Sequence, residues 1–206
     1  MSTLLIESSV RPARVGLAHE DGRIQTGEGQ APAESVEGLV RDWARVSRFG
    51  LSIGPGSFTG LRVGLSLLKG LAFVHPRPVA PISSLRVWAA SVDAPAVAAV
   101  LDARRERVFM ALYEGDRCLI PEAARPLAEA RALLEGRDCV LVGDGVEQLS
   151  LMLPKAQGVT RPSLRALARL VRSAPEEALR SPSELEPRYL LRTEIEEQLD
   201  PDGRGN

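Results

Sequence analysis

Between residues 54 and 64 the chain reads Gly-Pro-Gly-Ser-Phe-Thr-Gly-Leu-Arg-Val-Gly, directly after the apolar run Phe49–Ile53. The pattern predicts a buried strand, a glycine-rich turn and a helix over about Leu61–Phe73. Such a turn can bind an anion on the backbone N–H groups of the helix N-terminus. It can also be purely structural, because glycines permit a tight turn and Ser57 or Thr59 can cap the helix. The stretch has neither the Gly-Lys-Ser/Thr end of a Walker loop nor Gly-x-Gly-x-x-Gly spacing.

The helix after this turn is apolar around nearly its whole circumference, and Arg62 and Lys69 are its only charged residues. We therefore expect it to be buried on two sides. One stripe combines small and apolar residues, which would let another helix approach closely. This stripe is expected to contact either the second half of the chain or another protein chain, through Gly60, Leu61, Gly64, Leu65, Leu68 and Ala72.

The order of elements before this turn is repeated later in the chain. Each half shows three strands, a helix and a fourth strand that leads into a Gly-x-Gly turn. The repeat predicts two α/β lobes, over residues 1–95 and 96–198, with a hinge near Asp93–Ala96 and a disordered tail over 199–206. The expected elements are strands Leu4–Ile6, Val15–Ala18, Ile24–Thr26, Phe49–Ile53, Val97–Leu101, Val108–Tyr113, Cys118–Ile120 and Val140–Val142, and helices Ser35–Val46, Ser84–Val92, Pro126–Leu134 and Leu164–Val171.

Composition excludes several classes of protein. The 206 residues carry 26 basic and 27 acidic side chains, a net charge of -1, which argues against a sequence-blind nucleic-acid binder. Any direct RNA contact is expected to be local, and the densest basic cluster is Arg104, Arg105 and Arg107. No apolar window is long enough for a membrane span, and the two cysteines are far apart, so a reduced, cytoplasmic protein is expected.

Candidates for catalysis are few. The two histidines, His19 and His75, are far apart in sequence, so they offer no paired metal ligands on one helical face. Asp102 and Glu106 could bind Mg²⁺ through water or form a solvated charged turn. Ser57 has no recognisable base near it in the sequence. We therefore assign no catalytic residue and no metal ligand.

The 54–64 stretch resembles the signature of the bacterial TsaB family, accessory proteins of tRNA threonylcarbamoyladenosine formation. Leu4–Ser9, Leu101–Val108 and Glu186–Leu190 also resemble segments of that family. The resemblance implies an α/β fold of two ribonuclease-H-like lobes in an actin-like, Hsp70-like ATPase arrangement, with mixed sheets flanked by helices. Glu7 stands where the family commonly has Asp, and the Val10–Ala13 turn contains Pro12 and no glycine, which disfavours tight ATP binding in this lobe.

The resemblance further implies a non-catalytic scaffold that binds a catalytic TsaD-type relative, together with a TsaE-type P-loop ATPase. A homodimer is expected when the chain is alone, and tRNA is expected only through the complex. ATP and a metal would belong to the partner subunits, with no cofactor bound by this chain. The motif loop Gly54, Pro55, Gly56, Ser57, Phe58 and Thr59 has no ligand assigned. The alternatives are an actin-like-fold ATPase or a glycoprotease-like peptidase acting alone, and a direct tRNA-binding module.

Overall fold

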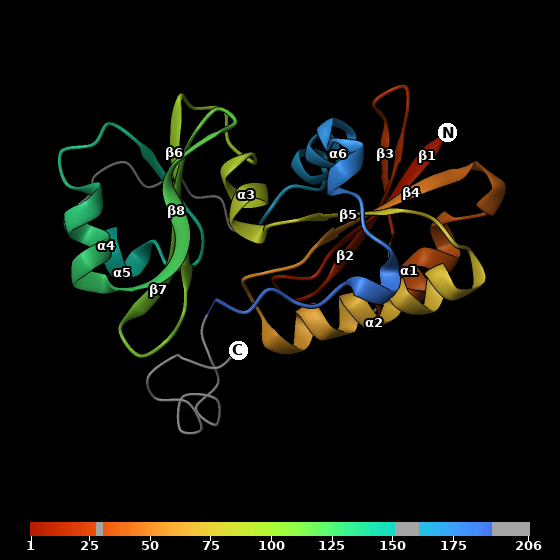
Figure 1. Cartoon of the computed structure of the whole chain (residues 1–206), viewed down its shortest axis with the longest axis horizontal. Coiled ribbons are helices and arrows are strands. Elements are labelled where there is room, and N and C mark those ends of the chain that lie inside the picture. The colour runs from red at the N-terminus through yellow and green to blue at the C-terminus, as the bar shows by residue number, and fades with distance from the viewer. Residues whose placement is uncertain (28–30, 151–160, 191–206) are drawn as a thin grey trace.

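The computed structural model describes residues 1–27, 31–150 and 161–190, so the tail expected over 199–206 lies outside the described residues. The chain forms two mixed sheets that stand side by side, each covered by helices (Figure 1). The first sheet has the strand order β3-β2-β1-β4-β5 and the second β8-β7-β6-β9. None of the helices in the described ranges is both long enough and apolar enough to span a membrane.

The first sheet is built on β1 (Ser2–Glu7), which pairs antiparallel with β2 (Arg14–His19) and parallel with β4 (Val46–Ser52). β3 (Ile24–Thr26) extends one edge of the sheet and β5 (Val79–Ile82) the other. Alternate residues of β1 point to opposite faces, as in any strand. Leu4 and Ile6 pack in one apolar cluster and Leu5 in another, so both faces of this sheet are buried.

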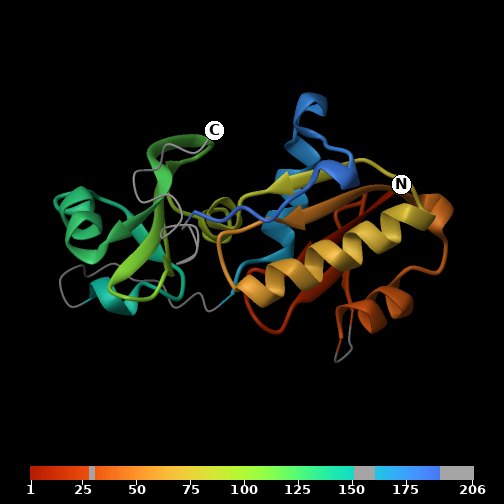
Figure 2. The ribbon, with the colours of Figure 1, turned by 60° about the horizontal axis from the view of Figure 1, so that its bottom comes forward.

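Helices cover the two faces of the first sheet separately (Figures 1 and 2). α1 (Pro32–Leu39) and α2 (Phe58–Val74) lie on one face, where α2 shares a core with Leu4 and Ile6. α6 (Leu164–Ser173) lies on the opposite face, against Leu5. By these contacts α6 belongs with the first sheet, although chain order places it within the expected second lobe of residues 96–198.

The second sheet repeats this topology. β6 (Ala96–Asp102) pairs antiparallel with β7 (Arg107–Glu114) and parallel with β9 (Val140–Val142), and β7 pairs antiparallel with β8 (Arg117–Pro126). One face is covered by α3 (Ser84–Ala89) and the other by α4 (Leu127–Leu134) and α5 (Glu147–Ser150). The repetition expected from the sequence is therefore present in the strand pairing.

The clearest differences from the predicted elements are a shortened helix and a strand that was not predicted, and β8 also extends to Pro126 beyond the expected Cys118–Ile120. The helix expected over Ser35–Val46 ends at Leu39, a 3-10 turn follows at Trp43–Arg45, and Val46 already begins β4. The Asp42 side chain accepts a hydrogen bond from the Ala44 backbone N–H at 3.0 Å, which favours a new turn over continuation of the helix. β5 was not predicted, because Pro78 and Pro81 on either side of Val79 obscure a short strand.

The motif loop and a candidate interaction surface

The motif loop, residues 54–59, turns the chain from β4 into α2. Gly54 has φ +112°, a conformation that a side chain disfavours, and its N–H donates to Ser84 Oγ at 3.0 Å. Ser57 is the N-cap of α2, and its Oγ accepts from the Gly60 N–H at 3.2 Å. The Ser57 N–H donates to the Ser9 carbonyl at 2.7 Å. The structural interpretation of the loop as a capped turn is therefore confirmed.

The glycines of α2 serve close packing against the turn after β1. A Cβ atom at Gly60 would lie 2.3 Å from the Ser8 carbonyl oxygen. One at Gly64 would lie 2.2 Å from Ser8 Oγ and 2.8 Å from Ser8 Cβ. Since Ser8 is fully buried, it has no free space into which to move. These two signature glycines let the first turn pack directly on the helix.

Glu7 ends β1 and is completely buried beside this contact. Its Oε1 accepts from the Ser9 N–H at 2.8 Å and from the Ser9 hydroxyl at 2.5 Å. Burial raises the pKa of this carboxyl, and the hydrogen bonds from Ser9 oppose the rise. Glu7 therefore acts as an internal hydrogen-bond acceptor that orders the turn after β1.

The stripe predicted as an interface faces the chain's own sheet. Leu61, Leu65, Leu68 and Ala72 are between 0% and 9% exposed, and Leu65, Leu68 and Ala72 share the core cluster of Leu4 and Phe49. These residues pack inside the chain's own core, so they are not available on its surface. The correction applies to all six predicted positions, Gly60, Leu61, Gly64, Leu65, Leu68 and Ala72, each of which is buried.

The opposite face of α2 is open to solvent and carries exposed apolar side chains. Of the six large hydrophobic residues exposed in the described part of the chain, four lie on α2: Phe58, Val63, Phe73 and Val74. Phe73 is 90% exposed. A seam spaced alternately four and three residues apart runs along this face and consists of Thr59, Val63, Ser66, Gly70 and Phe73. This is the spacing with which one helix packs along another, and we call these five residues the α2 seam.

Residues Glu186–Leu190 contact the start of α2 and connect the two sheets. Tyr189 stacks on Phe58, with ring centroids 5.4 Å apart, and its hydroxyl accepts from Arg62 Nε at 3.0 Å. The Arg188 N–H donates to the Ile53 carbonyl at 2.7 Å. The Arg188 guanidinium pairs with Glu122 on β8 at 2.5 Å. The Glu186–Leu190 motif thus joins β8, the motif loop and α2.

A cavity of about 700 Å³ separates the motif loop from the end of β6. Arg11 and Ser57 line one side, with Arg11 Nε donating to Ser57 Oγ at 3.3 Å, while Asp102 and Asp144 line the other. Asp144 Oδ1 accepts from the Asp102 N–H at 2.9 Å, and burial, followed by the charge of Asp102, raises the Asp144 pKa. Glu106 does not line this cavity, so the pair proposed for Mg²⁺ is not brought together there.

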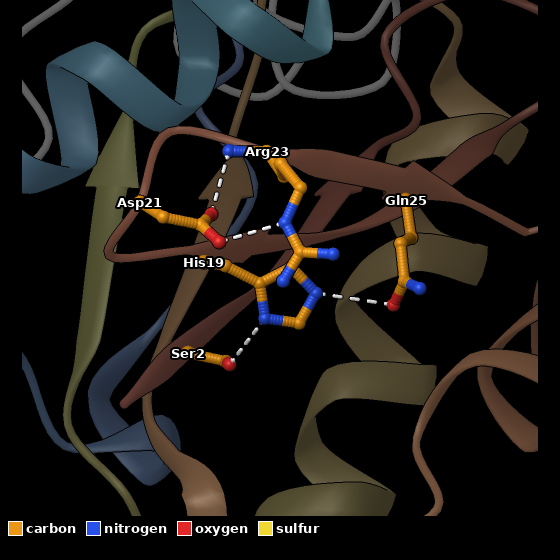
Figure 3. Close-up of polar contacts among 5 residues, drawn as sticks. All are labelled: Ser2, His19, Asp21, Arg23 and Gln25. Carbon is orange, nitrogen blue, oxygen red and sulfur yellow. Dashed lines mark hydrogen bonds and ion pairs between the residues drawn. The ribbon is translucent and has the colours of Figure 1, made fainter.

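The two histidines make separate local contacts. His19 Nδ1 lies 3.0 Å from Ser2 Oγ, and its Nε2 lies 3.1 Å from Gln25 Oε1 (Figure 3). His75 is the C-cap residue of α2 and stacks on Trp43 with ring centroids 4.1 Å apart. Across residues 1–27, 31–150 and 161–190, no group of three or more His, Cys, Asp or Glu residues is arranged to hold a metal ion.

Comparisons with known proteins agree with this architecture. The family model of TsaD, tRNA N6-adenosine threonylcarbamoyltransferase, matches residues 41–137, just under half of the chain. The "tRNA threonylcarbamoyladenosine biosynthesis protein TsaB" of Bacillus subtilis (strain 168) is 33% identical over 100 residues, 45% of this chain and 43% of that protein. The protein of the same name from Haemophilus influenzae is 47% identical over 60 residues, 27% of this chain and 25% of its own length. The matches therefore span less than half the length of these relatives.

A solved structure resembles nearly the whole chain. YeaZ from Pseudomonas aeruginosa has a TM-score of 0.76 at 24% identity, over 92% of this chain and 99% of that one. The fold is thus that of the actin-like class, with two ribonuclease-H-like lobes, and it presents an exposed apolar helix beside a capped glycine loop. The chain is thus similar in sequence, over less than half its length, to proteins named TsaB, and similar in fold to YeaZ.

Proposed function

We propose that this chain is a non-catalytic scaffold of tRNA threonylcarbamoyladenosine biosynthesis, which binds a TsaD-type catalytic subunit through the exposed face of α2. The assignment to threonylcarbamoyladenosine biosynthesis is based on the names of the matched relatives. The observation that carries the binding role is the α2 seam, because exposed apolar residues gathered on one helix mark a protein contact.

The composition of the seam suits a helix–helix contact. Val63 and Phe73 provide apolar area, while Thr59, Ser66 and Gly70 are small enough for a second helix backbone to approach. A Cβ atom at Gly70 would meet nothing within 4 Å, so this position is open on the partner side. A second copy offers the same seam, and a two-fold axis would bring the two seams together, which supports a homodimer when the catalytic subunit is absent.

The proposal divides the chemistry between subunits. ATP and a catalytic metal belong to the TsaD-type subunit and a TsaE-type P-loop ATPase, and this chain holds the assembly together and reaches tRNA as part of it. The hydrogen bonds within the motif loop support this division, because Ser57 is engaged in capping α2 and in bonding Ser9.

The test introduces a charge at the seam. Val63→Asp should weaken binding of the TsaD-type protein at least about tenfold, since burying a Val side chain stabilises a contact by roughly 1.5 kcal/mol or more. The same variant should shift the isolated chain from dimer to monomer in light scattering. Ala128→Asp on the exposed surface of α4 is the control and should change neither result. Retention of both associations by Val63→Asp, with melting unchanged, would refute the proposed interface.

A further inference from the structure

The solvent face of α6 is a row of arginines. Its apolar residues Leu164, Leu167 and Val171 are buried against the first sheet. Arg165, Arg169 and Arg172 follow one another at spacings of four and three residues and share the outer face, which we call the arginine face. At a rise of about 1.5 Å per residue, Arg169 and Arg172 lie about 6 and 10.5 Å along the axis from Arg165. The helix contains no acidic residue.

A cavity of about 340 Å³ adjoins this face. It lies between α6, the β2–β3 hairpin and the end of α3, and all three arginines line it. His19 and the hydroxyl-bearing residues Ser91 and Ser163 contribute further polar groups. No carboxylate is found among the described residues of its wall. The cavity is therefore suited to an anion.

One of the arginines is held in place by a contact that leaves its charge available. Arg169 Nη2 donates to the Ala90 carbonyl at 3.0 Å. Within the described part of the chain, Arg165 and Arg172 form no ion pair. The nearby hairpin carboxylates have other partners, since Asp21 pairs with Arg23 at 2.7 Å (Figure 3) and Glu20 pairs with the amino terminus at 2.9 Å. Asp93 lines a different cavity, to which Arg169 also contributes.

A larger hollow in the first lobe makes a useful contrast. It measures about 790 Å³ and also contains many charged groups, but carboxylates are among them and most of these charges are paired. The amino terminus pairs with Glu20, and Arg45 pairs with Asp42 at 3.4 Å. Charges that are already neutralised attract a ligand weakly, so the smaller, all-cationic cavity beside α6 is the stronger anion site.

The chemistry of the arginine face favours nucleic acid over protein. Protein interfaces are built around buried aromatic or aliphatic residues, and the large hydrophobic residues exposed in the described part of the chain lie elsewhere, mostly on α2. A regular row of guanidinium groups with no apolar residues at its centre is suited to binding successive phosphates of a nucleic-acid backbone. We propose that the arginine face of α6 binds the phosphate backbone of RNA.

This surface is separate from the proposed protein contact. α6 and α2 cover opposite faces of the first sheet (Figures 1 and 2), so the two surfaces can be occupied together. A local basic face also agrees with a net charge of -1, which excludes only a generally basic protein. The choice of transfer RNA as the probe rests on the proposed function.

The experiment measures binding of an unmodified tRNA transcript to the full chain by fluorescence anisotropy over a salt series. The test variant combines Arg165→Gln and Arg172→Gln and retains Arg169, which bonds Ala90. Each lost phosphate contact lowers the slope of log K against log salt by about 0.7–0.9, so the pair should lower it by about 1.4–1.8. The same relation gives an affinity loss of about 25- to 60-fold at ~0.1 M salt. The control, Arg41→Gln with Arg117→Gln, removes two exposed arginines elsewhere and should leave the slope unchanged and the affinity within about twofold.

Several results would overturn the inference. They are an absence of tRNA binding by the wild type, an equal loss in both double variants, and no loss in the α6 variant. Binding of a polyglutamate peptide without binding of tRNA would assign the face to an acidic protein instead. The α6 variant should still bind the TsaD-type protein, whereas Val63→Asp should still bind tRNA, so failure of this inference is distinguishable from failure of the proposed scaffold role.

Discussion

Two glycines of α2 allow the packing argument to be tested with the same substitution on one helix. Gly64→Ala places a Cβ atom 2.2 Å from Ser8 Oγ and 2.8 Å from Ser8 Cβ, inside a fully buried turn. Gly70→Ala places one in open space on the exposed face. Alanine is favoured over glycine by about 1 kcal/mol in a helix, and this gain applies to both variants. Only Gly64→Ala also incurs the cost of overpacking, about 3 kcal/mol for so short a contact.

The expected outcomes therefore have opposite signs. Gly70→Ala should gain about 1 kcal/mol, and Gly64→Ala should lose about 2 kcal/mol. For a chain of this length the difference corresponds to about 6–12 °C in melting temperature. Scanning calorimetry measures it, and both variants are compared in a Val63→Asp background so that association through the α2 seam does not contribute. Equal melting temperatures for the two variants would refute the view that Gly64 is required by the contact with Ser8.

Two further predictions concern buried titratable groups. Burial raises the pKa of Glu7 above its ordinary 4.5, so the folded chain retains this proton after the unfolded chain has lost it, and stability should fall as pH rises above about 4.5. Glu7→Gln removes this dependence of stability on pH, so the melting temperature of the variant should rise relative to that of the wild type between pH 4 and 7. A difference in melting temperature that stays constant over this range would contradict a raised pKa for Glu7. Burial and the hydrogen bond to Glu122 raise the pKa of Tyr113 well above its ordinary 10, so its phenolate absorbance at 295 nm should develop late in an alkaline titration. Tyr113→Phe should remove that late step, and its persistence would assign it to another group.

The candidate site was predictable in part. Ser57 as a helix cap and the glycines as a tight turn followed from local chemistry, because capping and turn conformation depend on neighbouring residues. The interface stripe was misassigned, since both faces of α2 contain apolar residues and their periodicity does not show which face meets the sheet. Arg62 and Lys69 were the available signal, because charged residues mark the outer side of a helix and both flank the α2 seam.

The arginine face could not be predicted from residues that are adjacent in the sequence. The sequence drew attention to Arg104, Arg105 and Arg107, which are neighbours along the chain. In the structure Arg104 and Arg105 have positive φ angles in the β6–β7 turn, and the Arg104 N–H bonds Asp102. Arg165, Arg169 and Arg172 come together because a helix turns every 3.6 residues and because the β2–β3 hairpin, far away in sequence, forms the other wall of the cavity.

By itself, the sequence determined most of the strands, the repeated topology and the loop that begins α2, because alternation, apolar runs and glycine or serine chemistry act over a few residues. Tertiary structure alone decided which side of α2 is exposed, that α6 returns to the first sheet, and that Arg188 pairs with Glu122 across the two sheets. Each of these depends on which surfaces are removed from water when distant segments pack, and no local pattern records that choice.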